Sequence, residues 1–209
     1  MTEATATPIT VEVFARGKTF NEYVESGIRN KDLFEQNYNG LVVTPEQAAK
    51  LKALAAKPGG PHHMVVIGED WCPDVYRGLG VAQKIAEAMG IDLRMFERDQ
   101  NKGIIQPYLK DGQFESIPVY VFYDKAHNEL GHFIERPKLA NEQIHITRDV
   151  LGDMSPEGMK MRLGHEPTDA EIAAERGKAR DKYLAWQRDS EIWAGWRTAA
   201  VDEIIELLS

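Results

Sequence analysis

The sequence contains one cysteine, Cys72, among its 209 residues. A single thiol excludes a disulfide within the chain and a zinc site built from several cysteines. Such sparing use of cysteine is typical of proteins from a reducing compartment. Any thiol chemistry of this chain therefore depends on Cys72.

Long apolar runs and an excess of positive charge are also missing. No stretch approaches the roughly 18 apolar residues of a membrane-spanning helix, and residues 1–8 lack the basic start and apolar centre of a signal peptide. We therefore expect a cytoplasmic protein with no membrane partner. The net charge of -8 argues against nucleic acid as a partner, because phosphate backbones bind basic surfaces.

Strand-like and helix-like segments alternate in the middle of the chain, which predicts an α/β fold. The length and the 43% hydrophobic content suffice for one core with additions. We expect a helical N-terminal extension over residues 1–60, a core over residues 61–150 and a helical C-terminal extension over residues 151–209. This last extension is expected to pack on the core or on a second subunit.

Local patterns predict the individual elements. In the first extension, helices are expected at residues 19–27, 31–37 and 44–56, the last beginning with a Thr44 cap and Pro45. In the core, strands are expected at residues 64–67, 91–96, 117–123 and 129–135, and helices at residues 73–89, 103–110 and 137–148. From Ser155 the chain is expected to be mostly helical, with a break near Asp189 or Gly195.

The segment with the most chemical information is Trp71-Cys72-Pro73-Asp74-Val75, where a predicted strand meets a predicted helix. A thiol at a helix N-terminus faces unpaired backbone N–H groups and the positive end of the helix dipole, and both favour the reactive thiolate. The nearby acids Glu69, Asp70 and Asp74 oppose this effect. Cys72 is therefore a candidate nucleophile.

Together with Ile117-Pro118, which precedes the third predicted strand, this segment resembles the active-site turn of the thioredoxin superfamily. It is most similar to that of bacterial thioredoxin-like proteins with a helical N-terminal addition, here with a single active-site cysteine. The resemblance implies a thioredoxin-like fold, which is a central mixed sheet flanked by helices, with a cis-proline at Pro118 facing Cys72. It implies that Cys72 is catalytic and that the site is shaped by Trp71, Pro73, Asp74, Val75, Ile117 and Pro118.

Two departures from the superfamily pattern bear on activity. Val75 stands where a second, resolving cysteine would lie, and Val66 stands where many thioredoxins carry a buried acid. Without a second thiol, the chain cannot by itself release a substrate held as a mixed disulfide.

Two functions remain open. The first is a monothiol oxidoreductase in which Cys72 attacks a protein or small-molecule disulfide, and glutathione or another small thiol acts as co-substrate and resolves the mixed disulfide. The alternative is a redox-inactive thioredoxin-fold module for binding or assembly, whose helical extensions engage a partner or a second subunit. Neither function requires a bound cofactor.

Histidines and aromatic residues outside this segment support no further chemistry. The six histidines, among them the adjacent pair His62 and His63, lack the close spacing of metal ligands, so no metal site is expected. Four aromatic residues of the C-terminal extension fall at spacings typical of one helical face, and these are Tyr183, Trp186, Trp193 and Trp196. They are expected to pack within the chain, with a homodimer through the C-terminal helix as the alternative.

Overall fold

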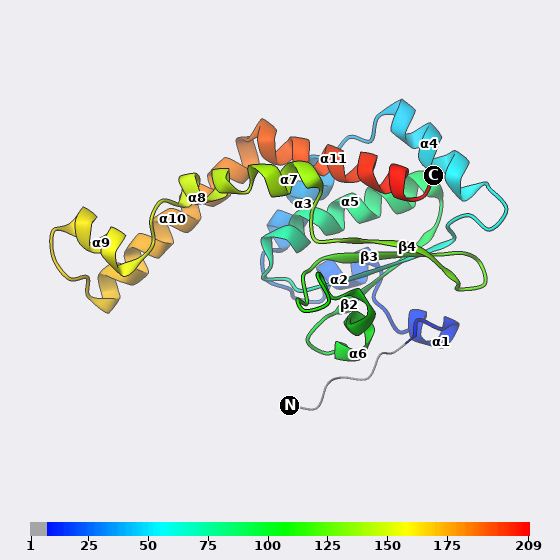
Figure 1. Cartoon of the computed structure of the whole chain (residues 1–209), viewed down its shortest axis with the longest axis horizontal. Helices are drawn as coiled ribbons and strands as arrows, with labels where there is room; N and C mark the ends of the chain where they lie inside the picture. The colour runs from blue at the N-terminus through cyan, green and yellow to red at the C-terminus, as the bar shows by residue number, and fades with distance from the viewer. Residues whose placement is uncertain (1–7) are drawn as a thin grey trace. The chain divides into compact units, whose positions relative to one another are not determined.

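The computed structural model describes residues 8–209 (Figure 1). It divides into two compact units, of which the first runs to Pro137 and also includes Arg197–Ser209, and the second is Lys138–Trp196. The division falls inside the last helix, α11 (Glu191–Leu207). The three-part organisation expected from the sequence stays a prediction, and its residues 1–7 lie outside the described part of the chain.

A four-stranded sheet forms the centre of the first unit. Its strands are β1 (His63–Gly68), β2 (Asp92–Glu97), β3 (Val119–Tyr123) and β4 (Glu129–Ile134), in the spatial order β2-β1-β3-β4. Strand β1 pairs parallel with β2 and antiparallel with β3, and β3 pairs antiparallel with β4. The predicted α/β class, with a mixed sheet flanked by helices, is therefore confirmed.

The two central strands are buried throughout their apolar runs. Met64 to Ile67 of β1 and Val119 to Phe122 of β3 have side chains that are almost wholly inaccessible to solvent. Continuous apolar runs of this kind are typical of strands covered on both faces. The register places Val66 directly opposite Tyr120.

Helix α5 (Pro73–Met89) packs against β1 and β2, and α3 (Lys31–Asn39) and α4 (Pro45–Ala55) pack against α5. Figure 1 shows α3 and α5 on the same side of the sheet. Besides the end of α11, this unit contains the short helices α1 (Val11–Phe14), α2 (Phe20–Glu25) and α6 (Lys102–Ile105) and a 3₁₀ turn at Gln106–Tyr108. The helix predicted at residues 73–89 is present with those bounds, and the helical segments predicted near residues 19–27, 31–37, 44–56 and 103–110 are present with shifted ends.

The start of α4 shows why these local predictions succeed. The Thr44 hydroxyl accepts a hydrogen bond from the Gln47 backbone N–H at 3.2 Å, and the Gln47 side chain accepts one from the Thr44 N–H at 3.0 Å. Pro45 occupies the first helical position, where no N–H is needed. All of these signals are local in sequence, so they can be recognised without the tertiary fold.

Two glycines inside α5 permit unusually close packing. A Cβ atom on Gly80 would lie 2.7 Å from the backbone nitrogen of Tyr38 and 2.9 Å from its Cα, which belong to α3. A Cβ atom on Gly78 would lie 2.0 Å from the Tyr120 hydroxyl and 2.9 Å from Cγ of Pro118. The absence of side chains at these positions lets α5 approach both α3 and the sheet.

The second unit is helical. It contains α7 (Lys138–Gln143), α8 (His145–Leu151), α9 (Pro156–Leu163), α10 (Asp169–Asp189) and the beginning of α11. The single helix expected at residues 137–148 is therefore wrong in detail, because α7 ends at Gln143 and α8 starts at His145. The break expected near Asp189 is confirmed, since Ser190 adopts an extended conformation between α10 and α11.

The break changes the arrangement of the four aromatic residues. Tyr183 and Trp186 lie on α10, whereas Trp193 and Trp196 lie on α11, so the four do not share one helical face. Their rings nevertheless contact one another, with centroid distances from 5.4 to 6.2 Å. The Trp196 indole also donates a hydrogen bond to Oε1 of Gln143 at 2.8 Å. The aromatic residues therefore pack with one another inside the second unit, and a homodimer contact stays a prediction.

No helix in residues 8–209 combines the length and the apolar character needed to cross a membrane.

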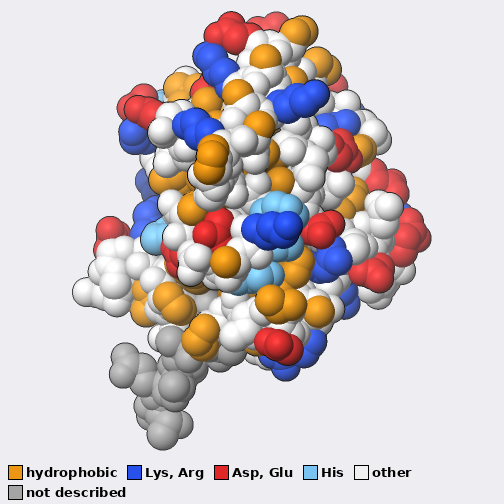
Figure 2. Space-filling view, turned by 90° about the vertical axis from the view of Figure 1, so that its right-hand side faces the viewer, with side chains coloured by type: hydrophobic (Ala, Val, Ile, Leu, Met, Phe, Trp, Pro, Cys, Tyr) orange, Lys and Arg blue, Asp and Glu red, His pale blue; other side chains and the backbone are white. Residues whose placement is uncertain are grey.

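A group of histidines lies against α1 in the first unit. The rings of His63 and His127 stack at 4.3 Å, and the Phe14 ring lies 4.8 Å from the first and 5.4 Å from the second. Figure 2 shows histidine side chains gathered near the centre of one face of the molecule. Burial lowers the pKa of His63, with further lowering from the charges of His127 and His62.

We predict that Gly80→Ala lowers the free energy of unfolding by roughly 1–3 kcal/mol, because the new methyl group would meet the α3 backbone, which cannot rotate away. Gly177→Ala in α10 is the matched control. No atom lies within 4 Å of its added Cβ, and we expect stabilisation by roughly 0.5–1 kcal/mol. Urea unfolding followed by circular dichroism measures both, and unchanged stability of Gly80→Ala would contradict the close packing.

A second prediction concerns pH. The folded chain binds a proton at His63 less readily than the unfolded chain, so stability is fully present above the unfolded histidine pKa, about 6.5, and is lost as pH falls below it. The variant His63→Gln should lose less stability between about pH 7.5 and 5.5 than the original chain. Urea midpoints at both pH values test this, and parallel losses in the two proteins would exclude His63 as the cause.

Candidate functional site

Cys72 lies in the turn between β1 and α5 and serves as the N-cap residue of α5. Its carbonyl accepts hydrogen bonds from the N–H groups of Val75 at 3.0 Å and Tyr76 at 3.1 Å, while its own N–H donates to the Glu69 carbonyl at 3.2 Å. Pro73 occupies the first helical position. The backbone on both sides of the thiol is therefore held in place, and the side chain is partly exposed.

The loop before β3 faces this thiol. The Ile117–Pro118 peptide bond is cis, and Sγ of Cys72 donates a hydrogen bond to the Ile117 carbonyl oxygen over 3.7 Å. The Pro118 carbonyl accepts a bond of 2.7 Å from the N–H of Glu135, just after β4. The structure thus brings together Cys72, Ile117 and Pro118, which are far apart in the sequence.

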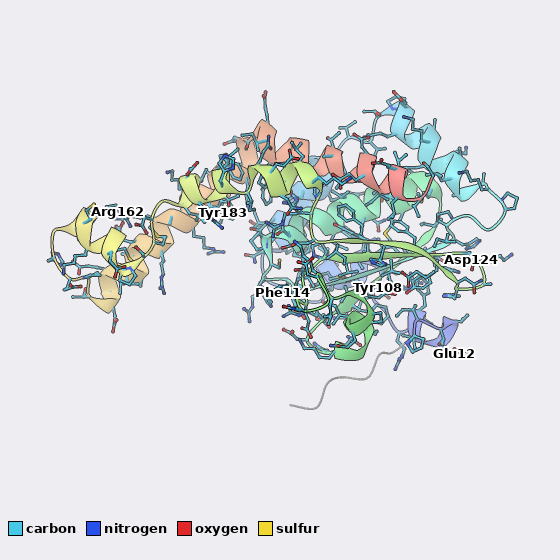
Figure 3. The ribbon with its side chains drawn as sticks, viewed as in Figure 1. Glu12, Tyr108, Phe114, Asp124, Arg162 and Tyr183 are labelled. Atoms are coloured by element: carbon cyan, nitrogen blue, oxygen red, sulfur yellow. The ribbon has the colours of Figure 1, made fainter. Side chains whose placement is uncertain are left out.

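Trp71 is 46% exposed beside the thiol. The Arg98 guanidinium lies over its indole, 5.4 Å from the ring centroid, and donates a hydrogen bond to the Glu115 carbonyl at 3.2 Å. Phe114, 58% exposed, projects from the same segment before β3 (Figure 3). Trp71 is therefore a partly solvent-facing aromatic residue held by a cation–π contact.

The two acids before Trp71 have structural roles that the sequence did not reveal. A Glu69 carboxylate oxygen accepts a hydrogen bond from the Asp99 N–H at 2.7 Å, and an Asp70 carboxylate oxygen accepts one from the Arg29 N–H at 2.8 Å. These carboxylates join the turn to neighbouring loops of the first unit.

Apolar side chains occupy the two positions at which the resemblance noted in the sequence implies a second cysteine and a buried acid. Val75 is wholly buried, and its methyl groups lie against Gly68, where an added Cβ would approach them to 2.8 Å. Val66 is also wholly buried, opposite Tyr120 in the sheet. Burial raises the pKa of Tyr120, so its phenol remains neutral below the first turn of α5.

Asp74 is held by two arginines. One carboxylate oxygen pairs with Arg77 at 2.6 Å, and the other pairs with Arg136 at 2.9 Å. Sequence reasoning missed both partners. The spacing of Asp74 and Arg77, three positions on a helix, was a usable signal, whereas Arg136 follows β4 and reaches Asp74 only through the fold.

The pKa of the Cys72 thiol is raised. Burial is the largest cause and the Asp74 carboxylate is the second, whereas the backbone N–H groups of Val75 and Asp74 and the Arg136 charge lower the pKa. The hydrogen bond to Ile117 also requires the protonated thiol. Burial therefore outweighs the helix-terminus effect that favours thiolate.

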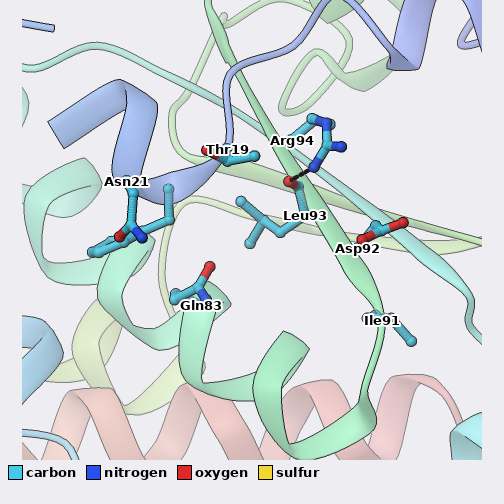
Figure 4. Close-up of a pocket in the computed structure, with 8 residues that line it drawn as sticks. Thr19, Asn21, Gln83, Ile91, Asp92, Leu93 and Arg94 are labelled. Carbon is cyan, nitrogen blue, oxygen red and sulfur yellow. Dashed lines mark hydrogen bonds between the residues drawn. The ribbon is translucent and has the colours of Figure 1, made fainter. Parts of the chain in front are cut away.

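No group of three or more histidine, cysteine, aspartate or glutamate side chains within residues 8–209 is arranged to hold a metal ion. A cavity of about 180 Å³ between α2, α5 and β2 is lined by Thr19, Gln83, Asp92 and Arg94, among others (Figure 4). The Arg94 guanidinium donates a bond of 2.8 Å to the Leu93 carbonyl there. None of the site residues predicted from the sequence lines this cavity.

A cysteine that caps the helix after the first core strand, opposite a cis-proline that precedes an antiparallel strand, defines a thioredoxin-like domain. The thioredoxin family model matches residues 17–150, more than half of the chain. The chain therefore belongs to the thioredoxin family, as the resemblance in the sequence implied.

Solved structures agree with this fold. A protein of unknown function from Pseudomonas aeruginosa, PA1234, superposes with a TM-score of 0.60 at 15% identity, covering 97% of this chain and 98% of its own. An HIV epitope-scaffold superposes with a TM-score of 0.57 at 17% identity, covering 94% and 95%. At these identities the likeness shows the fold alone. No curated protein matches the chain.

We predict that Val75→Cys forms a disulfide with Cys72 under mild oxidant, since Val75 lies three positions after Cys72 in the first turn of α5. The matched control is Val81→Cys, another buried position on α5. It lies nine residues from Cys72, about 13 Å along the helix axis, which exceeds the roughly 7 Å that a disulfide spans. Free-thiol titration distinguishes them, and two free thiols in oxidised Val75→Cys would contradict the alignment of this turn.

Proposed function

We propose that this protein is a monothiol oxidoreductase that exchanges disulfides through Cys72 alone. The observation that best supports this function is the position of its sulfur, partly exposed at the start of α5 and 3.7 Å from the Ile117 carbonyl across the cis-proline loop. In this position the thiol has helix N–H groups on one side and a backbone acceptor on the other.

The exchange takes place in two steps. The Cys72 thiolate attacks one sulfur of a substrate disulfide, forms a mixed disulfide and expels the other sulfur as a thiolate, which takes up a proton. Val75 offers no second thiol. A glutathione thiolate therefore attacks the substrate sulfur of the mixed disulfide, which releases Cys72 and leaves the substrate joined to glutathione. A second glutathione reduces that product and yields glutathione disulfide.

The Ile117 carbonyl links deprotonation to substrate binding. When Cys72 loses its proton, its hydrogen bond to Ile117 is lost and the carbonyl oxygen becomes available. An extended segment of a protein substrate can then donate a backbone N–H to this oxygen beside the sulfur, a short form of strand addition. The cytoplasm, which we propose as the location, would supply the glutathione.

The raised pKa of Cys72 limits the rate of this reaction. Only a small fraction of the thiol is ionised near neutral pH, so attack is slow and accelerates as pH rises. A thiol of high pKa is also a poor leaving group, which slows release of the mixed disulfide. The site therefore favours long-lived covalent complexes over rapid turnover.

The second candidate is a redox-inactive module for binding or assembly. The raised thiol pKa and the buried Val75 support it, because a protonated, partly buried cysteine behaves as a small apolar side chain.

We predict that the alkylation rate of Cys72 rises with pH to a midpoint above that of an ordinary free thiol, about 8.5. Reduction of a small disulfide by glutathione should be accelerated by the protein, increasingly so as pH rises, and Cys72→Ser should abolish the acceleration. Because Cys72 is the only cysteine, alkylation and mixed-disulfide mass both report on one atom. Equal rates with the original chain and with Cys72→Ser would favour the binding module.

A further inference from the structure

Five charged side chains form a connected group beside Cys72, which we call the charged corner: Asp74, Arg77, Lys110, Glu135 and Arg136. Asp74 pairs with Arg77 and Arg136, and Glu135 pairs with Arg136 and Lys110. Four of these side chains are strongly buried, with exposed fractions from 3% for Arg77 to 16% for Arg136. Partial burial strengthens these charge interactions relative to pairs in water.

The corner has one more cation than it has carboxylates. Its cations are Arg77, Lys110 and Arg136, and its carboxylates are Asp74 and Glu135. Each cation near the sulfur offsets part of the repulsion that the Asp74 carboxylate exerts on a thiolate. The corner therefore favours a thiolate more than an isolated Asp74 carboxylate would allow.

Arg136 is shared between the two carboxylates. Its Nη2 lies 2.9 Å from Oδ2 of Asp74 and also pairs with Glu135, whereas its Nε is buried with no hydrogen-bond partner among residues 8–209. Asp74 uses its second oxygen for Arg77. The Arg136 charge is thus shared between the Asp74 carboxylate, two residues after Cys72, and the Glu135 carboxylate.

The backbone ties this corner to the loop that faces Cys72. Glu135 adopts a left-handed conformation, with φ of 68°, and donates its N–H to the Pro118 carbonyl at 2.7 Å. Non-glycine residues rarely adopt this conformation, and they persist in it where their surroundings hold them. The charged corner and the cis-proline loop therefore form one connected wall of the site.

We infer that Arg136 is a positioning residue that controls the reactivity of Cys72 by neutralising the Asp74 carboxylate two residues from the sulfur. This inference rests on the proposed exchange reaction and assigns the regulation of its nucleophile. In agreement, Asp74 raises and Arg136 lowers the pKa of the thiol.

The other polar groups near the thiol are engaged elsewhere or uncharged, so we assign control of the thiol pKa to the charged corner. The Glu69 and Asp70 carboxylates in the turn accept backbone N–H groups of other loops, and the β3 side chain near the thiol is the neutral Tyr120 phenol. Asp74 on α5 and Arg136 after β4 act on the pKa of the thiol, and Arg77 and Glu135 pair with these two residues.

The test measures the Cys72 alkylation rate against pH in the original chain and in five variants, and it needs no disulfide substrate. Arg136→Gln should raise the midpoint by about 0.5 to 1 unit, which slows alkylation at pH 7.5 by roughly threefold to tenfold. Glu135→Gln should lower the midpoint, because Arg136 then acts on Asp74 alone. Arg136→Lys, which retains the charge, should remain close to the original chain.

Arg136→Gln and Glu135→Gln should shift the alkylation midpoint in opposite directions. A purely structural role would give shifts in the same direction, because either variant would loosen the charged corner. In an Asp74→Asn background, Arg136→Gln should shift the midpoint by less than half as much. Equal shifts in both backgrounds, or a raised or unchanged midpoint in Glu135→Gln, would overturn the inference. If Arg136→Gln does not fold, the Glu135→Gln result decides alone.

Loss of disulfide exchange with these shifts intact would refute the proposed function, whereas the control of the Cys72 pKa by Arg136 would remain supported.

Discussion

The contact between the Cys72 thiol and the Ile117 carbonyl joins two segments that are 45 residues apart, and the chemistry of the site depends on it. It brings the start of α5 against the loop before β3, so one side of the sulfur is shielded from water. Loss of water raises the cost of a thiolate, and the hydrogen bond holds the thiol in its protonated form. The same contact occupies the Ile117 carbonyl oxygen. Protonation of the thiol and occupation of this oxygen are therefore two aspects of one interaction.

The position of α5 is maintained by close packing as well as by the sheet. Gly78 admits the Tyr120 hydroxyl and Pro118, and Gly80 admits the backbone of α3, so the helix is confined on two sides. A helix held in this way keeps its first turn, with Cys72 and Asp74, at a constant distance from the cis-proline loop. Helix propensity alone would disfavour both glycines, which indicates that tertiary contact determines their presence.

The site also shows how electrostatic control differs from that expected of a two-cysteine thioredoxin. Val66 and Val75 make the interior beside Cys72 apolar, and Tyr120 is the neutral polar group beneath α5. The charged groups near Cys72 lie instead in the first turn of α5 and just after β4, where Asp74, Arg136 and Glu135 form a chain of ion pairs. The surroundings of the thiol are therefore apolar on the side of the sheet and charged at the first turn of α5.

The sequence by itself determined the order of the four strands and of most helices of the first unit, the cap of α4, the break near Asp189 and the place of Cys72 at a helix start. These features rest on interactions between residues a few positions apart, which a local pattern records. Only the tertiary structure decided that burial raises the Cys72 pKa, that Arg136 reaches Asp74, and that Glu69 and Asp70 bind neighbouring loops. Desolvation and ion pairing depend on residues that are distant in sequence and adjacent only after folding, so no local pattern contains them.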